Sequence, residues 1–356
     1  MQYYKTLHKD FKFNGSSYSE VELLALSDKY IAEGKEYQQA IGTFLKNWLN
    51  DDSFVKVNTS GSTGQRKEII LPKSKMINSA LATGEFFQLM PKQKALLCLS
   101  ADYIAGKMML VRAMVLGLEI DCIEPSSSPL RVNDKQYHFC AMVPLQVANS
   151  ISGLSKVKTL IVGGAAISTS LNERLQNTTC EVYATYGMTE TITHIALKKI
   201  NHLSLDTNAS VYKAITNVTF TVDERNCIVV HAPNVSDEIV VTNDVVNLIS
   251  KTEFKWLGRF DNVINSGGVK LFPEQIEAKL EKLISHRFFV AGIPDDQLGQ
   301  KLILIIEGNP DLEKLREAIN NSVLDIYEKP KEIILLPKFK ETATGKIQRA
   351  NTLELI

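Results

Sequence analysis

The chain has 356 residues, with 40 basic and 40 acidic side chains, so its formal net charge is zero. This balance gives no support for a nucleic-acid or membrane-surface partner, because both usually require a basic excess or stripe. Apolar residues make up 44% of the chain and charged residues 22%, as in ordinary globular proteins. The N-terminal MQYYKTLHKD lacks the apolar segment of a secretory signal, and no stretch approaches the ~18 apolar residues of a membrane span. We therefore expect a cytoplasmic protein.

The five cysteines are scattered, and no pair has metal-ligand or CxxC spacing. An odd number of cysteines also argues against a complete disulfide framework. Most of them lie in apolar, strand-like runs, which predicts buried free thiols in a reducing compartment. They are Cys98, Cys122, Cys140, Cys180 and Cys227.

The first part of the chain alternates between helical and strand-like patterns. Residues 20–50 have the apolar spacing of two amphipathic helices. Further helices are expected at 73–89, 104–117 and 168–176, and strands at 95–100, 119–123, 137–143, 157–164 and 180–187. Such alternation predicts a parallel α/β sheet with helices on both faces, and ligands gather at the carboxyl ends of its strands.

The pattern changes twice in the second part of the chain. From about residue 205 to 257 it consists of short β segments, which predict a β-rich appendage or barrel. These segments are VTFTV, CIVVHA, EIVVT, VVNLI and FKWLG. Beyond WLGRFDN a mixed α/β pattern returns, with helices expected at 273–284 and 311–320, strands at 287–293, 301–308 and 332–337, and a polar tail. We place a domain boundary near 258–262.

The run TSGSTGQRK, from Thr59 to Lys67, concentrates glycines and hydroxyls before two cations. Small residues let backbone N–H groups approach and surround an anion, and the hydroxyls add further donors. The run therefore suits a polyphosphate grip, although it does not have the GxxxxGK[ST] spacing of a Walker A loop. The alternative interpretation is a flexible Ser/Gly linker.

Six motifs in order, spanning residues 59–349, identify a family resemblance. They are TSGSTGQRK, GGAAI (163–167), TYGMTET (185–191), VTND (241–244), GRFDNVINSGGVKLFPEQIE (258–277) and TATGKIQR (342–349). The chain resembles the adenylate-forming superfamily, which includes acyl- and aryl-CoA synthetases, luciferases and carrier-protein adenylation domains. The resemblance implies a large N-terminal α/β domain (1–258) with parallel sheets and the β-rich appendage. A small mobile α+β C-terminal domain (262–356) would follow, with a hinge near Asp261. The N-terminal region is shorter than is usual for the family.

The resemblance also implies an ATP site. The residues that would hold its β- and γ-phosphates are Thr59, Ser60, Gly61, Ser62, Thr63, Gly64 and Lys67. The usual proline before the lysine is Arg66 here, and the middle glycine of the VTND motif is Asn243. The adenine and ribose would contact Gly163, Gly164, Ala165, Tyr186, Gly187, Asp244 and Arg259. Taken without the motif, Tyr186 reads as a core tyrosine, and Asp244 and Arg259 as a surface ion pair.

Three further residues would carry the chemistry in this resemblance. Glu190 would ligate Mg²⁺, which prefers carboxylate and phosphate oxygens. Thr189 would hydrogen-bond the α-phosphate, and Lys346 would bridge the substrate carboxylate and that phosphate. The substrate itself attacks the α-phosphorus, so catalysis rests on positioning and charge neutralisation. Outside the motifs, Glu190 and Lys346 would be ordinary solvated charges.

The second half-reaction would require a thiol, from coenzyme A, to reach the adenylate. In the family the small domain rotates about the aspartate of the GRxD motif, here Asp261. Rotation would withdraw Lys346 and bring in the loop containing Gly267 and Gly268, where a pantetheine arm could pass close to the backbone. Taken alone, Asp261 reads as a plain loop acid.

The apolar helix expected at 104–117 carries Lys107 and Arg112. A buried cation is costly unless it is paired, and guanidinium binds carboxylate bidentately, so Arg112 could meet a second carboxylate of the substrate. Alternatively, either cation reaches solvent or meets a protein acid. Tyr103 and His194 are further candidates for the acyl pocket, although a satisfied core histidine is an equal alternative for His194.

The short chain, the reduced N-terminal region and Arg112 together resemble the o-succinylbenzoate–CoA ligases of menaquinone synthesis. Their substrate is an aromatic dicarboxylate. Another aryl- or short acyl-CoA ligase, or an adenylation enzyme that loads a carrier-protein thiol, remains an alternative, although the absence of a fused carrier segment disfavours the latter. Lys346 and Glu190 argue against a relative that only binds nucleotide.

Overall fold

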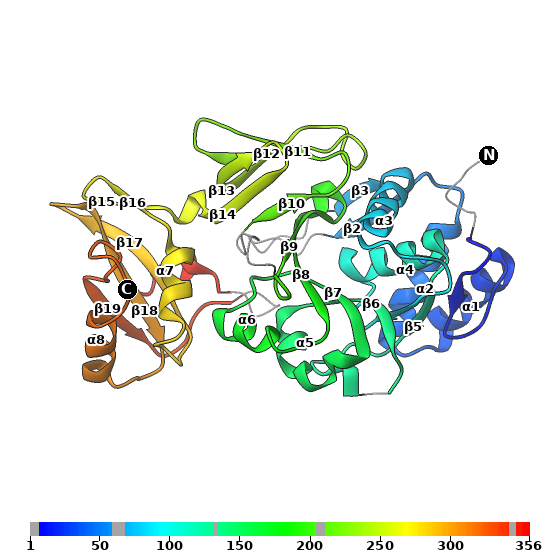
Figure 1. Cartoon of the computed structure of the whole chain (residues 1–356), viewed down its shortest axis with the longest axis horizontal. Coiled ribbons are helices and arrows are strands. Elements are labelled where there is room, and N and C mark those ends of the chain that lie inside the picture. The colour runs from blue at the N-terminus through cyan, green and yellow to red at the C-terminus, as the bar shows by residue number, and fades with distance from the viewer. Residues whose placement is uncertain (1–6, 59–67, 132–133, 204–210, 342–346) are drawn as a thin grey trace.

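The computed structural model describes residues 7–58, 68–131, 134–203, 211–341 and 347–356. A 12-stranded sheet dominates the larger part of the molecule (Figure 1). Its first half is parallel, as the alternating pattern predicted, and its strands in spatial order are β1 (Lys12–Phe13), β5 (Glu119–Cys122), β4 (Lys94–Leu97), β6 (Tyr137–Met142), β7 (Val157–Val162) and β8 (Glu181–Gly187).

The predicted β-rich appendage continues the same sheet with antiparallel strands. In spatial order these are β9 (His194–Lys199), β10 (Tyr212–Ala214), β14 (Glu253–Arg259), β13 (Val240–Ser250), β12 (Cys227–His231) and β11 (Thr219–Val222). The expectation of two strands at EIVVT and VVNLI was wrong, because residues 240–242 of the first and all of the second belong to β13. Its pairing with β14 begins at Asp244, opposite Arg259, and shifts register after Val245. Its pairing with β12 includes Val241 and Val245, so the strand passes the VTND motif without ending.

Helices cover both faces of the parallel half, as predicted. They are α1 (Glu20–Glu33), α2 (Glu36–Leu49), α3 (Lys73–Phe87), α4 (Ile104–Leu116), α5 (Pro144–Asn149) and α6 (Thr169–Leu175). Consecutive strand residues point to opposite faces, and accordingly Leu97 packs into the core under α2, α3 and α4 while Leu96 packs into the core under α5 and α6. The five cysteines are buried free thiols, as expected.

A two-stranded antiparallel hairpin, β2 (Phe54–Asn58) and β3 (Glu68–Pro72), stands apart from the main sheet. Its register pairs Asn58 with Glu68. The hairpin thus brings together the two residues that flank the Gly-rich run 59–67, and the run itself lies outside the described residues.

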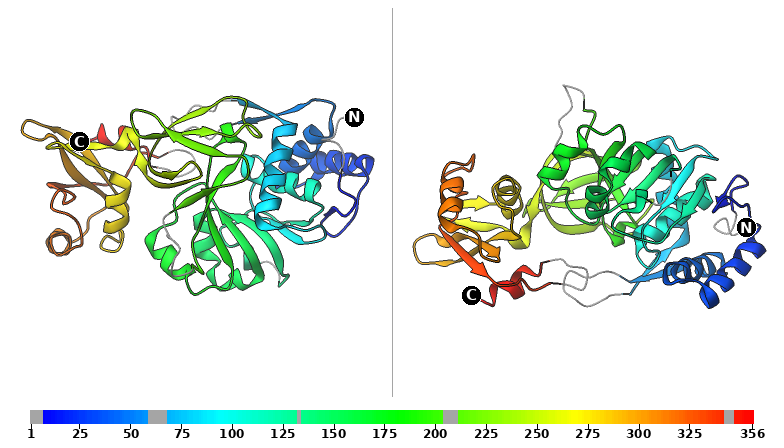
Figure 2. Two further views of the ribbon diagram at one scale, coloured as in Figure 1. Left: turned by 45° about the horizontal axis from the view of Figure 1, so that its top comes forward. Right: turned by 90° about the horizontal axis from the view of Figure 1, so that it is seen from below.

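A second sheet follows β14. It contains β15 (Ile264–Ser266), β16 (Val269–Leu271), β17 (Phe288–Asp295), β18 (Gly299–Glu307) and β19 (Glu332–Leu336), with α7 (Pro273–Leu280), α8 (Leu312–Asn320) and α9 (Arg349–Leu353). The sheet has its own buried cluster, and Figure 2 shows this part at one end of the molecule. Two details differ from expectation: α7 ends at Leu280 rather than 284, and the polar tail contains α9.

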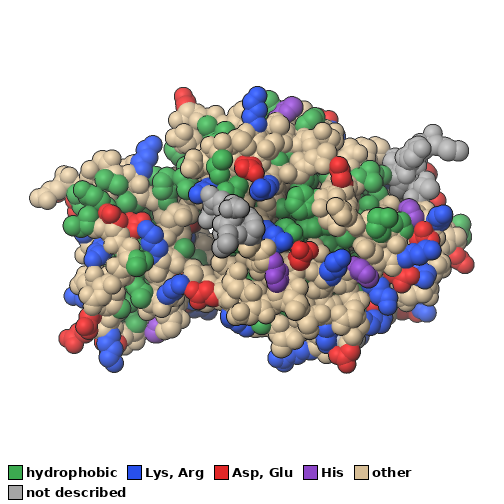
Figure 3. All heavy atoms as spheres, in the orientation of Figure 1, with side chains coloured by type: hydrophobic (Ala, Val, Ile, Leu, Met, Phe, Trp, Pro, Cys, Tyr) green, Lys and Arg blue, Asp and Glu red, His purple; other side chains and the backbone are tan. Residues whose placement is uncertain are grey.

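The surface agrees with the balanced composition. In Figure 3, Lys and Arg side chains are interspersed with Asp and Glu side chains over the face that is drawn. Across the described ranges, none of the helices combines the length and apolar character that crossing a bilayer demands.

Candidate functional site

Glycines follow two neighbouring strands where each reaches the carboxyl edge of the sheet. β7 ends at Val162 and leads into Gly163 and Gly164, and it pairs with β8 as far as Ala184. A Cβ on residue 163 would fall 2.4 Å from Thr185 Oγ1, and Gly164 has φ +84°, which suits glycine. Gly164 and Ala165 are exposed, so this edge presents bare backbone to a ligand.

Asp244 is the centre of a cluster drawn from three strands. The Tyr186 hydroxyl, at the end of β8, donates to Asp244 Oδ2 at 2.8 Å. Trp256 Nε1 and Arg259 Nη1, both on β14, donate to Oδ1 at 3.2 and 3.5 Å. Burial and the adjacent carboxylate raise the pKa of Tyr186, which keeps the hydroxyl protonated as a donor. The carboxylate is therefore fixed in direction and placed at the same sheet edge as Gly187.

Asp261 borders this cluster on its exposed side. Arg259 Nη2 lies 3.4 Å from Asp261 Oδ2, and Asn243 Nδ2 donates to the same oxygen at 3.2 Å. Asn243 is itself held by Arg225 Nη1, which donates to its side-chain oxygen at 2.9 Å. The residues of the VTND and GRFDN motifs, far apart in sequence, thus form one continuous polar chain.

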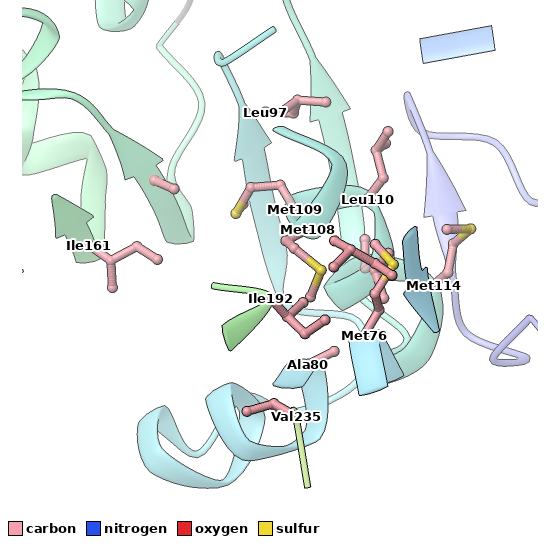
Figure 4. Close-up of a cluster of buried hydrophobic side chains, with 14 of the residues drawn as sticks. Met76, Ala80, Leu97, Met108, Met109, Leu110, Met114, Ile161, Ile192 and Val235 are labelled. Carbon is pink, nitrogen blue, oxygen red and sulfur yellow. The ribbon is translucent and has the colours of Figure 1, made fainter. Parts of the chain in front are cut away.

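The segment after β8 makes a sharp reversal. Thr189–Thr191 forms a short 3-10 helix, and Ile192 follows with φ +65° and ψ −58°. The Thr193 N–H donates to the Thr191 carbonyl at 2.7 Å, so Ile192 is the centre of a γ-turn. Positive φ is strained for a β-branched residue, and such strain costs about 1–3 kcal/mol. The strain persists because the Ile192 side chain is buried in the methionine-rich core of Figure 4.

Glu190 projects from this reversal as an exposed carboxylate. It lines an open cavity of about 500 Å³. The other walls of that cavity come mainly from β3 and from residues 235–241, and Lys75 on α3 also lines it. The acid predicted to hold Mg²⁺ therefore shares a cavity with the strand that follows the Gly-rich run.

Arg112 is a fully buried cation on α4, with a residue exposure of 1%. Its Nε donates to Thr83 Oγ1 at 3.2 Å and its Nη2 to Thr193 Oγ1 at 3.4 Å. Of the residues that the structure describes, Nη1 meets only Met109, whose sulfur is 3.9 Å away. No carboxylate in the described ranges forms an ion pair with it, and burial lowers the pKa of Arg112 to about 9.

His194 lies beside Arg112, at the start of β9, and is 4% exposed. Its Nε2 is 3.3 Å from Thr83 Oγ1 and its Nδ1 is 3.5 Å from Thr193 Oγ1. Burial, with the positive charge of Arg112, lowers the pKa of His194 well below its usual range. The structure therefore joins the two candidates through shared threonines.

The remaining acyl-pocket candidates lie elsewhere on α4. Tyr103 occupies the N-cap position of the helix, without a side-chain capping hydrogen bond, and is 46% exposed. The Lys107 ammonium donates to the carbonyls of Ala101 and Asp102, at 2.5 and 2.6 Å, and so fastens the turn before the helix. Burial lowers the pKa of Lys107. The structure thus brings Arg112 and His194 together, but it engages Lys107 with backbone carbonyls.

The other sequence candidates divide into described and undescribed residues. Gly267 and Gly268 form the exposed turn of the β15–β16 hairpin, with φ +57° and +81°. Two consecutive positive φ values are typical of the tight hairpin turn that glycines favour. Lys346 and the whole run 59–67 lie outside the described residues.

Three residues of the site were missed by sequence reasoning. Trp256 lies in a predicted strand, where nothing signalled that its indole would reach Asp244. Thr83 belongs to no motif. Thr193 stands beside His194, directly after the TYGMTET motif, and this position was the only signal that could have indicated it.

Comparisons with known proteins agree on one family. A family model described as AMP-binding enzyme matches residues 17–246. Over 316 residues, the chain is 23% identical to 2-succinylbenzoate–CoA ligase of Lactococcus lactis, covering 83% of this chain and 69% of that protein.

Solved structures include an acyl-CoA synthetase (AMP-forming)/AMP-acid ligase II-like protein from Dyadobacter fermentans. It has 34% identity and a TM-score of 0.61, with 93% of this chain and 97% of that chain covered. The fold is also similar to o-succinylbenzoate CoA synthetase from Bacillus subtilis in complex with the acyl-adenylate intermediate OSB-AMP. That comparison has a TM-score of 0.73 at 20% identity and covers 84% of this chain and 68% of that one.

Proposed function

The chain belongs to the AMP-binding enzyme family, and from this premise we propose that it is an ATP-dependent carboxylate–CoA ligase that activates o-succinylbenzoate through an acyl-adenylate. The name of the Lactococcus relative supports this choice of acid. The observation that carries it is Arg112, a buried cation for which the described chain supplies no carboxylate.

The substrate would supply the carboxylate that the described chain does not supply to Arg112. A buried cation without an anion is costly, and guanidinium binds a carboxylate with two parallel hydrogen bonds. The undescribed ranges contain a single acidic side chain, Asp206, so it is the one further carboxylate that the chain could bring to Arg112. A dicarboxylate would place one carboxylate on Arg112 and present the other for activation, whereas a monocarboxylate would leave the cation unpaired.

The nucleotide would lie along the carboxyl edge of the main sheet. Gly163, Gly164 and Ala165 provide exposed backbone for the adenine, and Tyr186 stands beside them at the end of β8. Asp244, held in direction by Tyr186, Trp256 and Arg259, would accept hydrogen bonds from the ribose hydroxyls. We assign the phosphates to the run 59–67. Strands β2 and β3 bring the residues on either side of this run together.

The donor set at Glu190 fits a magnesium ion that arrives with ATP. Mg²⁺ usually binds one or two carboxylates together with substrate phosphates. Glu190 is an exposed single carboxylate that lines a cavity. When bound, the ion would neutralise negative charge on the ATP phosphates and on the pyrophosphate that leaves.

The reaction itself requires no side-chain nucleophile. The substrate carboxylate would attack the α-phosphorus, and pyrophosphate would leave. Thr189 would hold the α-phosphate, and Lys346 would bridge this phosphate and the attacking oxygen. The protein thus supplies orientation and positive charge, which can account for large rate enhancements.

For the thioester step we propose that residues 262–356 rotate about Asp261 relative to residues 1–258. In the described ranges, the contacts between the two parts include several polar ones, such as the hydrogen bond from Gln275 Nε2 to the Leu257 carbonyl at 2.9 Å. Thr169 donates to Glu281 from its backbone at 2.7 Å and to the Ala278 carbonyl from its hydroxyl at 3.1 Å, and Lys282 pairs with Glu173. Exposed polar contacts of this kind contribute little each, so they can exchange during a rotation.

Pyrophosphate release with a panel of acids, with and without CoA, tests the proposal. Release with o-succinylbenzoate and conversion to its thioester are expected. Release only with simple benzoates or fatty acids would support another acyl-CoA ligase, and transfer only to a carrier-protein thiol would support a carrier-loading enzyme.

Two substitutions separate the steps. Arg112→Ala should raise KM for the dicarboxylate far more than for a monoacid analogue, so equal changes would contradict the role of Arg112. Lys346→Ala should abolish adenylation yet leave thioester formation from a supplied adenylate intact. Equal loss of both steps would contradict the domain rotation.

A further inference from the structure

The guanidinium of Arg112 has two edges that can bind an anion bidentately. One edge is formed by Nε and Nη2, and both of these atoms donate to threonine hydroxyls, on Thr83 and Thr193. Among the described residues, the other edge, formed by Nη1 and the second Nη2 proton, meets only the weak sulfur acceptor of Met109. The two threonines therefore occupy one edge and leave the other for a carboxylate.

The hydroxyl proton of Thr83 can be assigned from its neighbours. Thr83 Oγ1 lies 2.9 Å from the Ser79 carbonyl, which can only accept, and this is its shortest polar contact. The single hydroxyl proton therefore belongs to that bond. Oγ1 is left to accept from Arg112 Nε at 3.2 Å and from His194 Nε2 at 3.3 Å.

This assignment fixes the tautomer of His194. If Thr83 Oγ1 accepts, His194 Nε2 must carry a proton, and in a neutral imidazole Nδ1 is then an acceptor. Thr193 Oγ1, 3.5 Å from Nδ1, supplies the matching proton and in turn accepts from Arg112 Nη2. Four side chains thus form a closed ring in which donors and acceptors match.

A protonated His194 would break this ring. Its Nδ1 would no longer accept the Thr193 hydroxyl proton. A second positive charge would also stand beside a buried guanidinium that has no carboxylate in the described ranges. Burial and Arg112 already favour the neutral form. The ring therefore leaves Arg112 as its single charge and keeps that charge available to the ligand.

We propose that His194, acting through Thr83 and Thr193, is a positioning residue that holds the free edge of Arg112 ready for the second carboxylate of the substrate. This inference rests on the proposed function and extends it to residues that do not themselves touch the acid. It makes the preference for a diacid over a monoacid depend on an uncharged hydrogen-bond ring as well as on the cation.

Steady-state pyrophosphate release tests the proposal with o-succinylbenzoate and a monoacid analogue of similar size. Thr83→Val should raise KM for the diacid about tenfold or more while changing kcat and the monoacid KM little, because the hydroxyl that accepts from the charged Arg112 is lost. His194→Leu should act in the same direction, because both threonines lose the imidazole that orients them. His194→Gln should restore most of the diacid preference, since its amide can donate to Thr83.

Ser79→Ala is the matched control. Its hydroxyl is buried on the same helix, and within the described ranges it has no hydrogen-bond partner, so both KM values should stay unchanged. A wild type that activates no dicarboxylate would overturn the proposed function together with this inference. A wild type that prefers the diacid, with Thr83→Val and His194→Leu retaining that preference, would overturn this inference alone.

A second measurement does not require turnover. Long-range ¹H–¹⁵N correlation spectra of the protein at neutral pH report which imidazole nitrogen is protonated, and His194→Gln assigns the signal among the six histidines. We expect neutral His194 with its proton on Nε2. A proton on Nδ1, or an imidazolium, would overturn the ring even if a substituted enzyme failed to fold.

Discussion

Replacing Arg112 by methionine should make the protein more stable while impairing its activity on a dicarboxylate. Methionine keeps an unbranched side chain of similar reach and removes the charge. Burial lowers the pKa of Arg112 from 12.5 to about 9. Each tenfold change in proton affinity is worth about 1.4 kcal/mol, so the charged form costs on the order of 5 kcal/mol more in the fold than in water.

Part of that cost is offset by the hydrogen bonds to Thr83 and Thr193, which would be lost on substitution. The net gain in the free energy of unfolding should therefore be about 1–4 kcal/mol, similar to the gain when buried ion pairs are replaced by well-packed apolar residues. KM for o-succinylbenzoate should rise at least about a hundredfold, because a buried carboxylate that loses its partner costs about 3–5 kcal/mol.

Urea denaturation of the unliganded protein, followed by circular dichroism, measures the first effect, and pyrophosphate release measures the second. Leu110→Met, a substitution of similar volume on the same buried helix, controls for repacking and should change stability by less than about 1.5 kcal/mol. If Arg112→Met were instead destabilised by about 3–5 kcal/mol, Arg112 would have an anionic partner within the chain. The unpaired cation, and with it the basis for choosing a diacid, would then be refuted.

Three further predictions concern single side chains. Burial and Arg112 depress the pKa of His194, so only the unfolded state takes up the imidazole proton as pH falls from about 6.5. The free energy of unfolding should therefore decrease by up to about 1.4 kcal/mol per pH unit. His194→Gln should flatten that slope in acid denaturation, and an unchanged slope would contradict the burial argument. Gly258→Ala places a Cβ 2.4 Å from Glu274 Oε2 and should lower the free energy of unfolding by about 1–3 kcal/mol, measured by thermal unfolding. Adding Glu274→Ala should recover much of this stability, whereas additive losses would indicate a backbone clash instead. Gly187→Ala places a Cβ 2.2 Å from the backbone carbonyl oxygen of Thr193, so it should lower both stability and ATP turnover. Wild-type values in melting and pyrophosphate assays would count against the tight reversal described for this segment.

Much of the fold was predictable because its signals are local. Strand alternation, helical spacing and glycine turns each depend on residues a few positions apart, so the parallel half of the sheet and its covering helices could be read in chain order. One exception was not local in origin. EIVVT and VVNLI look like two strands with a polar break, but β12 pairs with Val241 and Val245, on both sides of Asp244, and so holds β13 as one strand. That outcome depends on a partner strand rather than on the segment itself.

The sequence by itself determined the family, through six ordered motifs, and with it the expectation of a nucleotide at the carboxyl edge of the sheet. Only the tertiary structure decided the surroundings of Arg112. Thr83 lies 29 residues before it and Thr193 lies 81 residues after it, on elements that the chain brings together by packing. Whether a buried cation is paired is a property of all the side chains that surround it in space, and no pattern along one helix contains that information.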